Sequence, residues 1–108
     1  MDYAKLTDVT NTAKNFYSKY SSWLNRYKGG MPVGFLSAIA ALESDGKMIS
    51  GDPSLGEYGF FQVATDTPGK FGLNADLRKD PEGNIFLGAL EYNVEAKRLA
   101  LRYPDLIK

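Results

Sequence analysis

The chain has 108 residues, no cysteine, no histidine, and equal numbers of basic and acidic side chains, thirteen of each. This length suits one small domain spanning residues 1–108, and the balanced charge disfavours binding to nucleic acid or to anionic membranes. Without Cys or His there is no disulfide framework, thiolate or histidine metal site, or histidine base, so any catalysis must use carboxylates or hydroxyls.

The segment from Asp8 to Lys28 is predicted to form an amphipathic helix. Its apolar side chains recur at intervals of three and four residues, and Gly29-Gly30 follows as a stop signal. The stripe consists of Val9, Ala13, Phe16, Tyr17, Tyr20, Leu24 and Tyr27. The preceding stretch, Met1 to Thr10, contains acidic residues and no apolar run, and we see no secretory signal there.

A second helix is predicted to begin near Pro32, which suits a first helical turn. The residues from Val33 to Leu42 are apolar nearly all round, which is typical of a helix buried at the centre of a domain. The weakly polar stretch from Met31 to Leu42 has only twelve residues. A bilayer span needs roughly 20, so we expect a core helix and no membrane span.

Turn signals fill the middle of the chain. Asp45-Gly46 and Gly51-Asp52-Pro53 predict an irregular loop or small β-hairpin over residues 45–58. Gly59 to Val63 is an apolar segment too short to assign, and Thr65 to Asn74 is expected to be loop.

The last helix is predicted to start at Asp80-Pro81-Glu82, with Asp as N-cap and Pro in the first turn, and to end at Pro104. Its apolar stripe consists of Ile85, Ala89, Tyr92, Ala96, Leu99 and Tyr103. The expected fold class is therefore mainly α, with three principal helices around a buried central helix and a small β-like or irregular loop.

Glu43-Ser44 is the most informative pair of residues, because it places one carboxylate at the end of the apolar helix, beside a polar loop. A general acid that works near neutral pH needs a raised pKa. Burial, distance from cations and a helix C-terminus each act in that direction. The sequence predicts all three for Glu43.

Three ordered blocks between Gly34 and Leu106 carry a family resemblance. They are the apolar helix ending in Glu43-Ser44, the segment Gly56-Glu57-Tyr58-Gly59-Phe60-Phe61-Gln62-Val63 after Asp52-Pro53-Ser54, and Asp80-Pro81-Glu82-Gly83-Asn84-Ile85 with Gly88. In this order they resemble the lytic transglycosylase domains of the lysozyme-like superfamily, which cleave the glycan strand of peptidoglycan.

The resemblance implies that Glu43 is both catalytic acid and base. It would protonate the glycosidic oxygen between N-acetylmuramic acid and N-acetylglucosamine, then accept a proton from the muramoyl 6-hydroxyl, leaving a 1,6-anhydro end. No metal or cofactor is implied. Ser44 and Gln62 would orient Glu43 or bind the N-acetyl group, and Gly59 would let the backbone approach the glycan. Phe60 and Phe61 are expected in the core.

Glu57 supports an alternative. Glu57-Tyr58-Gly59-Phe60-Phe61-Gln62 is also similar to the Asp-Tyr-Gly-x-x-Gln segment of animal-type lysozymes, whose Asp is the second catalytic carboxylate. Glycoside hydrolysis usually requires two carboxyl groups, so a lysozyme-type muramidase using Glu43 and Glu57 stays open. A solvated loop residue is the other interpretation of Glu57.

The chain departs from the family pattern near its end. Relatives carry a Tyr-Asn-Ala-Gly segment whose Tyr contacts the catalytic Glu, and only the dipeptide Tyr92-Asn93 matches it. Either a downstream segment belongs to this domain, or another aromatic residue such as Tyr58 or Tyr92 takes that place. Ser54 in the central loop is a further candidate for contact with the glycan.

The implied partner is peptidoglycan, so the expected place of action is the bacterial cell wall or periplasm, with a virion-borne or extracellular enzyme also possible. A different class of function stays open. The domain could be a non-catalytic glycan-binding or structural part of a phage-tail, secretion or other envelope assembly.

Overall fold

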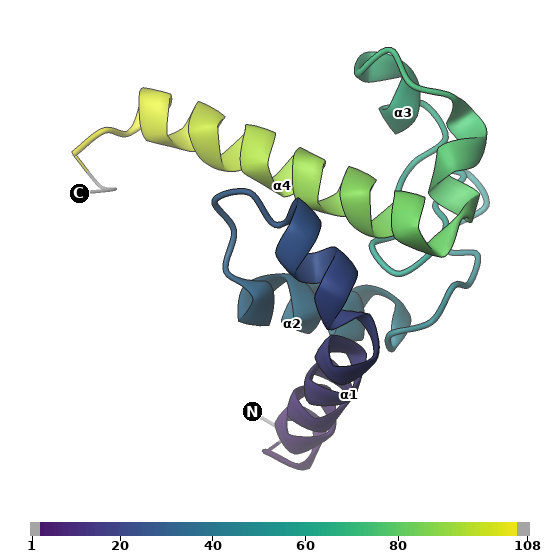
Figure 1. The fold of residues 1–108 in the computed structure, drawn as a ribbon, viewed down its shortest axis with the longest axis vertical. Coiled ribbons are helices and arrows are strands. Elements are labelled where there is room, and N and C mark those ends of the chain that lie inside the picture. Colours follow the sequence, from purple (N-terminus) through teal and green to yellow (C-terminus); the bar gives the residue numbers. More distant parts are fainter. Residues whose placement is uncertain (1–2, 106–108) are drawn as a thin grey trace.

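The computed structural model describes residues 3–105, with side chains from residue 8 onward. Within this range the protein is mainly α-helical, as predicted, and contains no strand (Figure 1). In chain order the elements are α1 (Tyr3–Tyr27), α2 (Val33–Ser44), α3 (Thr67–Lys70), the 3-10 helix η1 (Ala75–Lys79) and α4 (Pro81–Arg102). The start of the segment Met1 to Thr10 and the end of the resemblance at Leu106 lie outside the described residues.

The first helix, α1, begins earlier than predicted and bends at Tyr20, whose φ and ψ of −120° and 19° are not helical. It ends at Tyr27, just before Gly29, which adopts a positive φ of 56° as the predicted stop signal requires. In Figure 1 the N-terminal half of α1 and the C-terminal half of α4 extend away from the rest of the domain. Among the described helices, none is both long and apolar enough to cross a bilayer.

The prediction that α2 is buried on all sides is wrong. Phe35 and Leu42 are 50% and 70% exposed, whereas Leu36 and Ala40 on the opposite face are fully buried. Among the long helices it is α1 that packs against both of the others, α2 and α4. An apolar composition makes burial favourable, but in the described part of the chain the outer face of α2 is only partly covered, where the Phe35 ring meets Tyr92 of α4.

The region between residues 45 and 79 is less regular than the helices around it but more ordered than predicted. Isolated antiparallel bridges, Ser50 with Tyr58 and Tyr58 with Val63, stand where a loop or hairpin was expected. The expected loop over Thr65 to Asn74 contains the short helix α3, and η1 follows it. Elements of four or five residues are too short to leave a periodic pattern in the sequence.

The predicted start of α4 is confirmed. The Asp80 carboxylate accepts a hydrogen bond of 2.9 Å from the backbone N–H of Gly83, and Pro81 occupies the first turn. Side chains from α4, α1, α2 and the segment after Tyr58 then share one core. Its buried members are Phe16, Leu24, Leu36, Ile39, Ala40, Phe60, Phe61, Val63, Ile85, Leu87 and Ala89.

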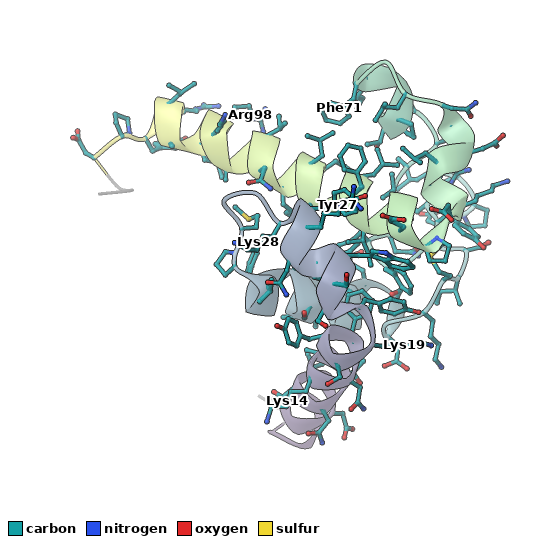
Figure 2. All side chains as sticks on the ribbon, in the orientation of Figure 1. Lys14, Lys19, Tyr27, Lys28, Phe71 and Arg98 are labelled. Carbon is teal, nitrogen blue, oxygen red and sulfur yellow. The ribbon has the colours of Figure 1, made fainter. Side chains whose placement is uncertain are left out.

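Two polar contacts fasten α4 to α1 and to the turn that follows α1. Tyr27 lies where α1 crosses α4 (Figure 2), and its hydroxyl donates a 2.6 Å hydrogen bond to Glu82. Farther along α4, Asn93 accepts a hydrogen bond from the Gly30 N–H and donates one to the Lys28 carbonyl, at 2.9 and 2.8 Å. The turn between α1 and α2 is therefore tied to α4.

Asn84 joins α4 to the central loop. It is fully buried, its amide nitrogen donates to the carbonyls of Tyr58 and Arg78 at 2.9 and 2.7 Å, and its amide oxygen accepts from the Phe61 N–H at 3.0 Å. One side chain thus satisfies three backbone groups of segments that have no regular ladder of their own.

Asn84→Ala is expected to lower the free energy of unfolding by about 2–4 kcal/mol, because it leaves these backbone groups without a partner in the interior. The measurement is urea-induced unfolding followed by circular dichroism. Asn25→Ala is the matched control, because Asn25 is exposed and donates its hydrogen bonds to the Tyr17 hydroxyl and the Ser21 carbonyl within α1. Its effect should stay within about 0.5 kcal/mol. Equal effects of the two substitutions would contradict the role given to Asn84.

Candidate active site

A cavity of about 290 Å³ lies between the end of α2, the central loop and α4. Four of the residues singled out in the sequence line it, namely Glu43, Glu57, Gln62 and Tyr92, together with Phe61, Glu91 and Glu95. This volume is at the small end of the range for ligand sites, as in a shallow cleft that holds part of an extended ligand.

Glu43 lies in the last turn of α2, as predicted, but its side chain is exposed. The burial expected for this carboxyl is therefore absent in the free domain. The residues that line the cavity include no lysine or arginine, although one of them, Glu95, pairs with Arg98.

Ser44, predicted to orient Glu43 or bind sugar, is buried and faces the protein interior. Its hydroxyl lies 2.9 Å from the Phe60 carbonyl and 3.0 Å from the Ala40 carbonyl, and it accepts a hydrogen bond from the Lys47 N–H. The side chain thus ties the end of α2 to the loop, and contact with a sugar is not available to it. Any effect on Glu43 is exerted through the backbone.

Gly59, predicted to let the backbone approach the glycan, instead makes room for Asn84. Its φ is 88°, and a Cβ built on it would lie 2.1 Å from the Asn84 amide nitrogen. The close approach inferred from the sequence is real, but a side chain of the protein occupies the space. Gly59 therefore shapes the loop from inside the domain.

Gln62 lines the cavity with a backbone held in the left-handed region, at a φ of 50°. Its amide nitrogen donates hydrogen bonds to the carbonyls of Ile49 and Gly59, at 3.0 and 2.9 Å. These bonds close the loop on itself. Gln62 therefore stabilises the loop that carries Glu57, and Gln62 itself also lines the cavity.

Phe61 brings the loop against α4. It is 5% exposed, and a Cβ added to Gly88 would lie 2.3 Å from its ring, so only glycine permits this contact. Phe60 is buried against Phe16, with ring centroids 4.9 Å apart. Both phenylalanines therefore lie in the core, as expected, and Phe61 also forms part of the cavity wall.

Tyr92 is the aromatic residue of α4 that lies beside Glu43. Burial raises the pKa of Tyr92, and the nearby carboxylates of Glu43 and Glu91 raise it further. Its ring also meets Phe35 edge to face, with centroids 6.1 Å apart. At neutral pH its hydroxyl is therefore protonated and able to donate a hydrogen bond within the cavity.

Tyr58 and Ser54, the other predicted glycan contacts, are not among the residues that line this cavity. The Tyr58 ring packs against the guanidinium of Arg78, 6.0 Å from its centroid. The Ser54 hydroxyl donates a 2.7 Å hydrogen bond to Asp52 in an exposed turn. Of the two tyrosines considered as neighbours of Glu43, the structure places Tyr92 next to it.

Two lining residues, Glu91 and Glu95, were not singled out from the sequence. Burial raises the pKa of Glu91, while Lys70 lowers it and Asp66 raises it by smaller amounts. Glu95 forms an ion pair with Arg98. The only sequence signal for Glu91 is its position three residues after Gly88, the point at which the loop touches α4.

Comparisons with protein-family models, with curated proteins and with solved structures find no match for this chain. Within residues 3–105, no three acidic side chains are grouped closely enough to hold a metal ion. The polar groups that line the cavity are the carboxyl groups of its glutamates, the amide of Gln62 and the phenol of Tyr92.

The raised pKa of Glu91 predicts a pH-dependent contribution to stability. Because the folded state binds this proton more tightly, the contribution is fully present below the ordinary pKa of 4.5 and is lost as pH rises through the folded-state value. Glu91→Gln removes it, so the variant should gain stability relative to the unsubstituted protein between pH 4 and pH 7. Urea unfolding at both pH values measures this, and an unchanged difference would contradict the prediction.

Proposed function

We propose that this domain cleaves the glycan strand of peptidoglycan as a lytic transglycosylase, with Glu43 as the acid and base. The observation that carries the proposal is the meeting of Glu43 and Gln62, from two of the sequence blocks, with Tyr92 in one cavity. The mainly helical fold agrees with the lysozyme-like architecture that the sequence blocks resemble. The substrate places the action at the bacterial cell wall or periplasm.

In the first step Glu43 would protonate the glycosidic oxygen as the bond to the muramoyl C1 breaks. In the second step the Glu43 carboxylate would remove the proton of the muramoyl 6-hydroxyl as its oxygen bonds to C1. The proton returns to Glu43, no water is consumed, and the product carries a 1,6-anhydro ring. One carboxyl can serve in both steps when the sugar's own groups stabilise the oxocarbenium-like state.

The exposure of Glu43 in the free domain is compatible with this cycle because the glycan itself would cover the carboxyl. A sugar seated between Phe61 and Tyr92 would displace water from the cavity and desolvate Glu43 only when the substrate is bound. The Tyr92 hydroxyl, beside Glu43, would then hydrogen-bond this carboxyl or the leaving oxygen. Tyr92 would thereby take the place of the tyrosine that lytic transglycosylase domains supply from a later segment.

A lysozyme-type hydrolase is the second candidate, and the position of Glu57 on the same cavity favours it. In that case Glu57 would act as nucleophile or activate water, and the product would carry a reducing end. The two reactions therefore differ in their products as well as in their dependence on Glu57.

Glu43→Gln is expected to reduce the release of anhydromuramoyl fragments by at least about 100-fold, because it removes the group that gives and takes the proton. The measurement is mass spectrometry of soluble fragments from digested sacculi. Asp45→Asn is the matched control, since it removes an exposed carboxylate two residues farther on and should leave the rate unchanged.

Other products of this digestion decide against the proposal. Reducing ends that disappear in Glu57→Gln would identify a hydrolase. Folded protein that binds sacculi equally with and without Glu43→Gln, and releases nothing, would identify a non-catalytic glycan-binding or structural domain, for example in a phage or envelope assembly.

Tyr92→Phe should lower the turnover number by about tenfold, the value of one hydrogen bond made in the transition state, with little change in stability. Tyr58→Phe is the control because Tyr58 packs on Arg78 outside the cavity. Turnover is measured on sacculi over a range of concentrations. Equal rates for the two variants would show that the Tyr92 hydroxyl takes no part.

A further inference from the structure

Glu91 occupies an unusual environment within the candidate site. It lines the cavity from α4 and is half-buried, whereas Glu43 is exposed and Glu95 is paired with Arg98. In the part of the chain that the structure describes, no side chain donates a hydrogen bond to the Glu91 carboxyl and no cation lies within ion-pair distance of it.

The charged groups around Glu91 come from several elements. Lys70 at the end of α3 and Asp66, just before its start, act on it electrostatically, and they also pair with each other at 3.8 Å. On its own helix it is followed by Tyr92 and, one turn later, by Glu95. Across the cavity lie Glu43 and Glu57. Lys70 is the one cation that favours the ionised form of Glu91, and it is shared with Asp66.

A half-buried carboxyl without a hydrogen-bonding or cationic partner is accommodated at least cost in its neutral form. In that form it has an O–H that can donate a hydrogen bond, which an ionised carboxylate cannot do. The sugar rings of a glycan and their N-acetyl groups present oxygens that accept such bonds. Burial also raises the pKa of Glu91, in the direction that keeps the proton in place.

We propose that Glu91 is a glycan-contacting residue of this site, whose protonated carboxyl donates a hydrogen bond to an acceptor oxygen of the bound sugar. The inference rests on the proposed function of the cavity. Glu91 takes no part in proton transfer, so Glu43 alone exchanges protons with the substrate. Ionisation of Glu91 replaces a donor with an anion that faces the sugar oxygen, and glycan affinity therefore falls as pH rises.

The test measures the binding of a soluble tetrasaccharide of alternating N-acetylglucosamine and N-acetylmuramic acid, by calorimetry at pH 5 and pH 8. The parent protein carries Glu43→Gln, which prevents turnover during the titration. We expect its dissociation constant to rise about tenfold between the two pH values, the effect of one lost hydrogen bond. Adding Glu91→Gln, which keeps a neutral donor, should give the tighter affinity at both values.

Adding Glu91→Ala to the same parent should weaken binding about tenfold at pH 5 and should remove the pH dependence. Asp76→Asn, which changes an exposed carboxylate of η1, is the control and should keep the pH dependence of the parent. Thermal unfolding of each variant shows that it is folded at both pH values.

Two results would overturn the role of Glu91 alone. They are a pH dependence that persists in Glu91→Gln, and an affinity of folded Glu91→Ala at pH 5 equal to that of the parent at pH 5. If the protein with Glu43 intact neither binds nor cleaves glycan, the proposed function fails and the role of Glu91 fails with it. If the unsubstituted protein cleaves glycan but both Glu91 variants bind it at pH 5 as the parent does and keep the parent's pH dependence, the proposed function stands and only the role of Glu91 fails.

Discussion

The buried amide of Asn84 is the contact on which the arrangement of this domain depends. The central loop has no regular ladder of hydrogen bonds, so its backbone must find partners elsewhere. Asn84 provides them for Tyr58, Phe61 and Arg78 from a single position on α4. The absence of a side chain at Gly59 makes this approach possible. The loop therefore has one defined position against α4.

That position determines which side chains meet. With the loop on α4, Phe61 rests on Gly88, and the next turn of α4 brings Glu91 and Tyr92 to the same cavity. Ser44 completes the arrangement from the other side, because its bond to the Phe60 carbonyl holds the end of α2, and with it Glu43, at the cavity. Asn84, Gly59 and Ser44, which face the protein interior, thus set the positions of the side chains that line the cavity.

The cavity combines an exposed acid with a withdrawn one. Glu43 is exposed, and Glu91 is half-buried in the same cavity. In the proposed reaction this difference separates two tasks, since the exposed carboxyl exchanges protons and the half-buried one binds. Tyr92 lies beside both of them, so its hydroxyl can respond to the charge of either.

Local signals in the sequence were enough to predict the start of α4 at Asp80-Pro81, the end of α2 at Glu43-Ser44 and the mainly helical class, because caps and periodicity act over a few residues. The helix end singled out Glu43, and the family resemblance added Gln62 and Tyr92 as candidates. Only the tertiary structure decided that Gly59 faces Asn84, that one face of α2 is only partly covered, and that Glu91 belongs to the cavity. Those outcomes depend on the relative placement of segments tens of residues apart, which no local pattern encodes.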